Sequence, residues 1–317
     1  MNEATKAPQP ATSAGNRYGG IATAMKRNYV LYLMVLPAIV GFFLFHYKPL
    51  YGILIAFKQY DLVLGFDRSP WVGMKQYVSF FHDPYALRII RNTLVIGSYS
   101  LLFGFWPPIV LALMLNELTS SRWKRWFQSI SYLPHFIAMV VVVGMMVQLL
   151  KADGPVNLLL ASIGIEPIAF FNDASYFRSL YIGSGIWQSI GWGSILYIAA
   201  LTGIDPELYE ASYMDGANRF QRIRHISIPG IMPTITILFI LHASDIVNVG
   251  FEKAYLMLNP ALYETGDVIQ TYVYRRGIVE RNFSFATAVG LLNSVASFLV
   301  LYAANRLSRR ANGQSLW

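Results

Sequence analysis

The side chains best suited to chemistry are few in this 317-residue chain, and they form no catalytic or metal-binding pattern. There is no cysteine, which excludes a disulfide framework, a thiolate metal site and a cysteine nucleophile. The histidines show no HExxH or other metal-ligand spacing, and no G-x-x-x-x-G-K-[ST] nucleotide loop occurs. The five histidines are His46, His82, His135, His225 and His242. We therefore expect this chain to have no catalytic residues, no metal site and no bound cofactor.

One apolar stretch nevertheless carries polar side chains at a regular spacing. In LHASDIVNVG, His242, Asp245 and Asn248 recur every three residues, so a helix would place them on roughly one face. Asp245 is the only acidic or basic residue in the interior of any long apolar run described below. Because a charge at membrane depth is costly, we expect Asp245 to face a cavity rather than lipid.

Aromatic and amide side chains in other apolar runs extend this candidate cavity. They are Trp187, Gln188, Trp192 and Tyr197 in one run and Asn293 in another. An aromatic face packs on the C–H surface of a sugar, and amides and carboxylates hydrogen-bond to its hydroxyls, so the set suits a sugar. Polar side chains in membrane helices also join neighbouring helices, and this structural role remains an alternative for each position.

The composition indicates a membrane protein. Hydrophobic residues make up 55% of the chain and charged residues only 13%, whereas a soluble domain carries about 25% charged residues. The formal charge of +8 does not indicate nucleic-acid binding, because the basic residues lie between long apolar runs rather than clustering on one surface. We therefore expect a polytopic membrane protein that binds no nucleic acid.

Six apolar runs have the roughly 20 residues that a transmembrane helix needs. They lie at about 29–45, 93–116, 128–150, 180–203, 231–250 and 285–304. Barrel strands would be shorter and would alternate, so the predicted fold is an all-α membrane protein with six transmembrane helices. The expected organisation is a mobile cytoplasmic tail at 1–28, a transmembrane domain at 29–305 and a cytoplasmic C-terminal tail at 306–317.

Basic residues beside the spans favour an orientation with both termini in the cytoplasm. The supporting residues are Lys26 and Arg27, then Arg122, Lys124 and Arg125, and finally Arg306, Arg309 and Arg310. Arg88 and Arg91, before the second span, count against this orientation. With it, the polar segment between the fourth and fifth spans lies in the cytoplasm.

That segment, 205–229, is predicted to form two short helices. Asp205 is a good N-cap and Pro206 suits the first helical position, so a helix should begin there. Gly216 can end it. Asn218 can then cap a second helix that runs through His225 and stops before Pro229.

The first of these helices has a surface suited to docking in a groove. Ala211 and Ser212 are small enough to let a partner approach closely, while Glu210 and Asp215 supply charge that can pair with a partner's arginine. An amphipathic helix lying against the membrane would have a similar composition. From the residues alone, both interpretations stand.

A resemblance to a known family favours the docking helix over a helix lying against the membrane. The segment EASYMDGANRFQRIRHISIP is similar to the EAA loop of permeases in ATP-binding-cassette (ABC) importers. In that family the loop reads Glu-Ala-Ala, three residues, Gly, nine residues, Ile, one residue, Leu-Pro. The matching positions are Glu210, Ala211, Ser212, Gly216, Ile226, Ile228 and Pro229. Serine replaces the usual alanine at Ser212 and isoleucine replaces the usual leucine at Ile228, both with little change in size. The resemblance implies a coupling helix that docks on an ATPase subunit.

Other segments extend the resemblance over nearly the whole chain beyond the tail. PLYGILIAFKQYD, WVGMKQYVSFF, RNTLVIG and VIQTYVYRRGI resemble carbohydrate-uptake (maltose-type) permeases, and within these the LplB-like branch. The resemblance implies import of oligosaccharides, including fragments of acidic polysaccharides, across the bacterial cytoplasmic (inner) membrane. It also implies a second, homologous permease, two ATPase subunits that hold ATP-Mg, and an extracytoplasmic solute-binding protein.

Three points stay open. Pro107 and Pro108 lie inside the second predicted span, and a helix broken there would suit a secondary transporter or channel. An acidic sugar would be repelled by Asp245 unless that residue were protonated or paired. The charged outer segment 251–285 is either a docking surface for the binding protein or a solvated loop. Its charged residues include Glu252, Lys253, Arg275, Arg276, Glu280 and Arg281.

Overall fold

The computed structural model describes Lys26, residues 28–313 and residues 315–316, and in this part the chain is helical with no strand. The predicted all-α fold is confirmed for these residues. The chain divides into an N-terminal unit, Met1–Leu54, and a main unit, Ile55–Trp317, which we describe separately. The predicted mobile tail at 1–28 falls almost entirely outside the described residues.

The N-terminal unit is built on α2 (Tyr29–Phe42), a π-helical turn (Phe43–Tyr47) and α3 (Lys48–Leu50). Only Lys48 separates the π turn from Pro49, whose ring cannot fit the regular hydrogen-bond ladder of an α-helix. This helical stretch belongs to the candidate membrane span Tyr29–Phe57.

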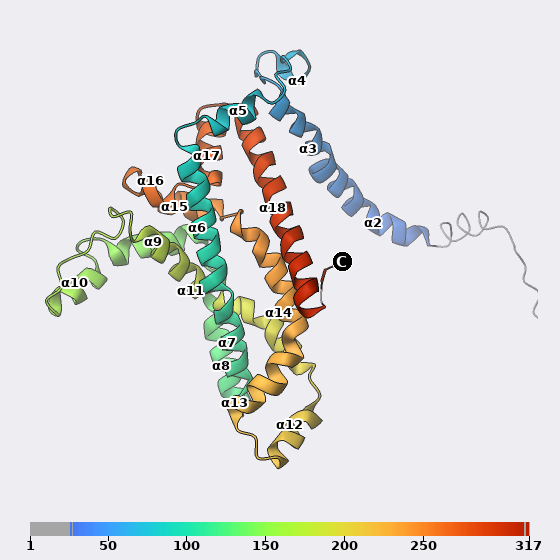
Figure 1. Cartoon of the computed structure of the whole chain (residues 1–317), viewed down its shortest axis with the longest axis vertical. Coiled ribbons are helices and arrows are strands. Elements are labelled where there is room, and N and C mark those ends of the chain that lie inside the picture. Colours follow the sequence, from blue (N-terminus) through green and yellow to red (C-terminus); the bar gives the residue numbers. More distant parts are fainter. Residues whose placement is uncertain (1–25, 27, 314, 317) are drawn as a thin grey trace, which may run out of the picture. The chain divides into compact units, whose positions relative to one another are not determined.

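In the main unit, long helices supply the other spans (Figure 1). The candidate spans there are Ala86–Asn116, Met139–Ser162, Arg219–Ile246 and Phe283–Arg310. The helices within them are α6 (Ala86–Gly104), α7 (Trp106–Asn116), α9 (Met139–Leu150), α10 (Pro155–Ser162), α13 (Arg219–Arg222), α14 (Ile228–Ala243) and α18 (Phe283–Asn312). The remaining predicted span, 180–203, corresponds to α11 (Phe177–Thr202). At 26 residues α11 is long enough to cross, but its glycines, serines and Gln188 make it less apolar than the others.

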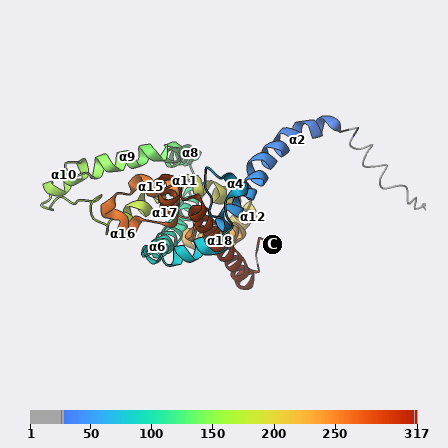
Figure 2. The ribbon, with the colours of Figure 1, turned by 90° about the horizontal axis from the view of Figure 1, so that it is seen from above.

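The structure corrects the single uninterrupted span predicted at 128–150. Helix α8 (Ser121–Tyr132) gives way to a 3-10 turn at Leu133–Phe136, and the backbone is extended at Ile137 before α9 begins. Pro134 sits inside the 3-10 turn, where its missing N–H and its ring disfavour a continuing α-helix. Helix α9 packs against α15 (Phe251–Met257), and α10 extends beyond it, away from the other helices of the main unit (Figures 1 and 2).

Pro107 and Pro108, by contrast, scarcely interrupt their helix. Only Phe105 separates α6 from α7, and both prolines fall in the first turn of α7, where a missing N–H is tolerated. Phe105 itself is buried in a core cluster that joins α7, α11 and α14. The second predicted span is therefore one nearly continuous element rather than a broken helix.

Helix α11 lies at the centre of the main unit and packs against α6, α7, α8 and α14. A Cβ atom at Gly191 would stand 2.0 Å from the carbonyl oxygen of Ser131, and one at Gly193 would stand 3.1 Å from Cγ of Pro108. Small residues of this kind let membrane helices approach closely enough for van der Waals packing to hold them together. Gly191 thus sets the distance between α11 and α8.

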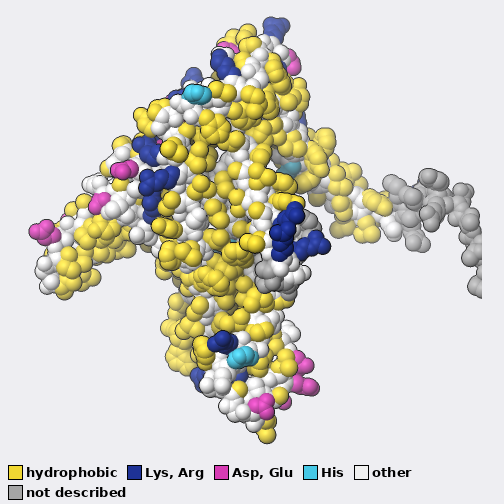
Figure 3. All heavy atoms as spheres, in the orientation of Figure 1, with side chains coloured by type: hydrophobic (Ala, Val, Ile, Leu, Met, Phe, Trp, Pro, Cys, Tyr) yellow, Lys and Arg dark blue, Asp and Glu magenta, His cyan; other side chains and the backbone are white. Residues whose placement is uncertain are grey.

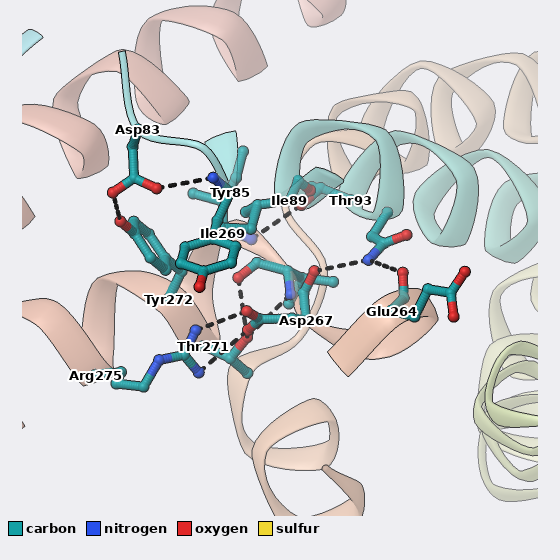
Figure 4. A network of polar contacts seen from close by, with 12 residues as sticks. Asp83, Tyr85, Ile89, Thr93, Glu264, Asp267, Ile269, Thr271, Tyr272 and Arg275 are labelled. Atoms are coloured by element: carbon teal, nitrogen blue, oxygen red, sulfur yellow. Dashed lines mark hydrogen bonds and ion pairs between the residues drawn. The ribbon is translucent and has the colours of Figure 1, made fainter. Parts of the chain in front are cut away.

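The segment 251–285, predicted as an outer loop, is instead largely helical. It contains α15 (Phe251–Met257), α16 (Tyr263–Gly266), α17 (Ile269–Tyr274) and a π turn at Arg275–Val279. Figure 4 shows how polar contacts join it to α6 and to Asp83, which follows α5 (Lys75–Phe81). The Asp267 carboxylate is 0% exposed and lies 2.6 Å from the Arg275 guanidinium. Asn92 donates to the carbonyl oxygens of Glu264 and Asp267, and the Tyr272 hydroxyl donates to Asp83.

The Gly191 contact predicts the effect of adding one methyl group. Gly191→Ala should destabilise the protein by about 1–3 kcal/mol, because the new Cβ overlaps the α8 backbone and one helix must move. Gly183→Ala is the matched control on α11, since a Cβ there meets nothing within 4 Å and alanine favours a helix. The measurement is the thermal aggregation midpoint of the detergent-purified protein. Equal midpoints for the two variants would contradict the close contact.

Candidate functional site

The first candidate site is the segment 205–229, which lies at one end of the main unit (Figure 1). Helix α12 (Pro206–Met214) begins as predicted, with the Asp205 carboxylate accepting the Glu207 N–H at 3.0 Å. Gly216 follows it with φ of +75°, a left-handed conformation that glycine adopts without strain. Asn218 and Gln221 form a capping box at the start of α13. The predicted caps and turn are confirmed.

Helix α12 is open to partners along much of its surface. Glu210, Ala211 and Asp215 are exposed, and Ser212 is half-buried with its hydroxyl donating to the Tyr209 carbonyl. Figure 3 shows acidic side chains gathered at this end of the molecule, beyond a broad hydrophobic band. The surface therefore combines small, apolar and acidic groups, as a docking helix requires.

The remaining loop positions of the predicted site contribute differently. Ile226 and Ile228 are half-buried, and Ile228 packs against the cluster formed by α7, α11 and α14. Pro229 is exposed in the first turn of α14. Ile228 therefore anchors the far end of the segment, while the surface of α12 stays exposed.

A buried arginine that the sequence reading did not single out braces this segment from behind. The Arg222 side chain is 5% exposed and lies 3.6 Å from the Glu117 carboxylate at the end of α7. It donates to the Ala217 carbonyl at 3.0 Å and stacks 4.0 Å from the centre of the Tyr213 ring. These contacts hold α12 and α13 against the end of α7.

The second half of the segment does not stop before Pro229, which corrects the sequence prediction. Helix α13 continues through a π turn at Ile223–Ser227 directly into α14, so Arg219–Ile246 forms one helical stretch of 28 residues. The widened π turn lies where the Pro229 ring would clash with the carbonyl of a regular α-helix. The loop is therefore joined to a membrane span without a flexible break.

The second candidate site is a cavity of about 450 Å³ in the main unit. Gln188 and Trp192 of α11 line it together with His242 of α14 and Asp245 of the following 3-10 turn. Tyr197 lines an adjoining cavity of about 370 Å³ that shares Trp192 and His242 with the first. The structure thus brings together five of the eight residues predicted from the sequence.

The other three predicted residues do not line this cavity. Trp187 is not among the lining residues, and the Asn248 side chain accepts a hydrogen bond from Gln270 at 3.0 Å. Helix α14 ends at Ala243 and the chain passes through a 3-10 turn into irregular backbone, so the three-residue spacing no longer keeps Asn248 on the face of Asp245. Asn293 of α18 also lies outside both cavities.

A further residue, Lys253, lines the cavity, although the sequence predicted it on an outer loop. It lies in α15, and only 6% of it is exposed. Its ammonium donates to the Tyr181 carbonyl at 2.5 Å and stands 4.7 Å from the centre of that ring. Burial lowers the pKa of Lys253 to about 8.

The aromatic and amide groups of the cavity are held in place by neighbouring segments. The Trp192 ring stacks on His135 with 4.5 Å between ring centres and 2° between planes. Gln188 donates to the Ile137 carbonyl at 3.0 Å. Both partners belong to the non-helical break between α8 and α9, so this break supports the cavity wall.

Comparison with known proteins identifies the fold and the family. Residues 104–313 match the family described as the binding-protein-dependent transport system inner membrane component. Protein LplB of Bacillus subtilis (strain 168) is 41% identical over 313 residues, 98% of each chain. The polygalacturonan/rhamnogalacturonan transport system permease protein YteP of the same organism is 40% identical over 288 residues, 90% of each chain.

A solved structure agrees with these sequence matches. A chain of a bacterial ABC transporter involved in the import of the acidic polysaccharide alginate has a TM-score of 0.86 and 42% identity, covering 92% of this chain and 99% of that chain. The resemblance to ABC importer permeases drawn from the loop is thereby confirmed. This chain belongs to the family of inner-membrane permease components of binding-protein-dependent ABC transport systems.

Proposed function

We propose that this chain carries oligosaccharides into the cytoplasm as one permease subunit of an ABC importer. The observation that supports this most directly is the cavity in which the Trp192 ring, the Gln188 amide and two charged side chains converge. Aromatic faces and hydrogen-bonding groups around an otherwise apolar space suit a sugar. The relatives named for polygalacturonan/rhamnogalacturonan and alginate transport support the same class of cargo.

The proposed complex contains a second, homologous permease, two ATPase subunits and an extracytoplasmic solute-binding protein. In it, ATP-Mg is held and hydrolysed by the ATPase subunits, and this chain binds no cofactor of its own. The exposed acidic surface of α12 supports docking on an ATPase subunit. A related alginate transporter was solved with an alginate pentasaccharide-bound periplasmic protein, which supports a partner of that kind.

In the proposed mechanism, closure of the ATPase subunits on ATP pushes α12 and thereby moves α13 and α14 as one body. His242 and Asp245 lie at the far end of that continuous helix, so the cavity wall moves with the docking helix. The cavity then opens alternately to the two sides of the membrane.

The proposed orientation places 205–229 and both chain termini in the cytoplasm of a bacterium. The spans then make the protein a multi-pass component of the cytoplasmic (inner) membrane. Helices α5 and α17 lie toward the end of the main unit opposite α12, which in this orientation puts them outside, within reach of the solute-binding protein (Figure 1).

Charge reversal at Glu210 tests the docking surface. Glu210→Arg should abolish copurification of the ATPase subunits or lower sugar-stimulated ATP hydrolysis about tenfold or more, because a carboxylate facing a partner's cation becomes a repelling charge. Glu166→Arg, at an exposed position between α10 and α11, makes the same charge change away from α12 and should leave both properties intact. Normal association and stimulation in the Glu210→Arg complex would rule out this role.

Two tryptophans of α11 offer a matched test of the cavity. Trp192 and Trp187 are each 46% exposed, but only Trp192 lines the cavity. Trp192→Ala should lower oligosaccharide uptake by reconstituted complexes severalfold through loss of a sugar-stacking face, while Trp187→Ala retains uptake. Both variants should retain their ATPase subunits on purification. Equal loss of uptake in both variants would show that the cavity is not the path of the sugar.

A further inference from the structure

Lys253 is a buried cation for which the chain supplies little compensation. Its ammonium has three N–H donors, and among the described residues only the Tyr181 carbonyl accepts one of them. No carboxylate of the described chain lies within 4.0 Å of it. A cation removed from water without a counter-charge is costly, so a residue needed only for packing would be apolar at this position.

The surrounding backbone keeps space for this ammonium. A Cβ atom at Gly185 of α11 would stand 3.2 Å from Nζ of Lys253, closer than nearly all such contacts. Glycine at this position therefore leaves the charged end of Lys253 free on the cavity side. The cavity thus presents a cation whose remaining donors can reach a ligand.

A second charge in the cavity restricts what that ligand can be. Asp245 lines the same space from the turn after α14, next to His242, and forms no ion pair with Lys253. A ligand that uses both groups needs an anionic group for Lys253 and hydroxyl donors for Asp245. Sugars built from uronic acids carry both kinds of group on each residue. The repulsion between Asp245 and an acidic sugar then orients the carboxylate toward Lys253.

We propose that Lys253 binds a carboxylate of the sugar in transit, so that the cargo is an acidic oligosaccharide of the uronate class. This inference rests on the proposed import function and adds to it the charge of the substrate and the residue that recognises it. Lys253 acts in this proposal as a specificity-determining residue of the cavity.

Two substitutions at Lys253 separate charge from volume. Lys253→Met keeps a long unbranched side chain and removes the charge, whereas Lys253→Arg keeps the charge. With complexes in proteoliposomes and saturating binding protein loaded with oligogalacturonate, Lys253→Met should lower uptake about tenfold or more while ATPase association is retained. Lys253→Arg should restore most of the uptake. Because the binding protein is the same in all the complexes, a difference in uptake between them arises from the permease.

The pH dependence gives a readout that a packing role would not produce. The pKa of Lys253 near 8 means that the ammonium is present at pH 7 and mostly lost at pH 9. Wild-type uptake should therefore fall between these values relative to Lys253→Arg, whose guanidinium stays charged, and Lys253→Met should be low at both. The other titratable groups around Lys253 are Tyr181 of α11, His242 and Asp245 of the opposite wall, and Tyr274 of α17, which packs on α15. These groups are the same in the wild type and in Lys253→Arg, so their titration affects both uptake profiles equally.

Three outcomes would be decisive against the proposal. Wild-type-like uptake by Lys253→Met, or a pH profile of Lys253→Arg that falls in parallel with the wild type, would overturn the role of Lys253. Uptake of neutral oligosaccharides alone would overturn the acidic cargo and leave sugar import standing. Failure to import any oligosaccharide, acidic or neutral, would instead overturn the proposed function.

Discussion

The close approach of helices at glycine residues is the contact on which the rest of the main unit depends. In a bilayer, helices gain nothing from burying apolar surface against each other, so association relies on tight packing and polar contacts. A Cβ at Gly97 of α6 would stand 2.0 Å from the Ile246 carbonyl, and one at Gly191 would stand equally close to that of Ser131. The first contact fixes the turn that carries Asp245, and the second holds α11 against the end of α8; Asp245 and two residues of α11, Gln188 and Trp192, line the cavity. These two glycine contacts therefore fix the elements that form the cavity wall.

The same packing gives α12 a rigid support. Arg222 holds the base of the segment to Glu117 of α7, and the Tyr209 hydroxyl shares a hydrogen bond with Ser227 in the π turn. From the capping box at Asn218 to Asp245 the chain is one helical stretch. In the proposed mechanism, a displacement of α12 therefore reaches the cavity through this helical stretch, and the turn at Gly216 is the one non-helical link between them.

Local signals in the sequence predicted the features that depend on local physics. The Asp205 cap, the Gly216 turn and the Asn218 cap follow from nearest-neighbour hydrogen bonding, and long apolar runs indicate helices. The break after Tyr132 does follow a local signal, Pro134, but the long apolar run around it masked that signal. The helical course of 251–285 depends on contacts with residues far away in the sequence. Lys253 was misplaced for this reason, because a charge beside an apolar run reads as exposed unless tertiary packing is known. Asn248 was misassigned because the spacing argument assumed that α14 continued past Ala243.

Comparison with two arginines of this chain, the buried Arg222 and the partly buried Arg275, shows why Lys253 differs from a structural charge. Arg222 has a carboxylate, a carbonyl and an aromatic ring as partners, and Arg275 has the fully buried Asp267 at 2.6 Å. The charge of each arginine is balanced by partners within the chain, and these partners offset the free-energy cost of removing it from water. Lys253 has one carbonyl and the Tyr181 ring beneath its ammonium, so in our proposal the missing counter-charge comes from what enters the cavity. Sequence alone cannot make this distinction, because all three residues appear as ordinary basic residues beside apolar runs.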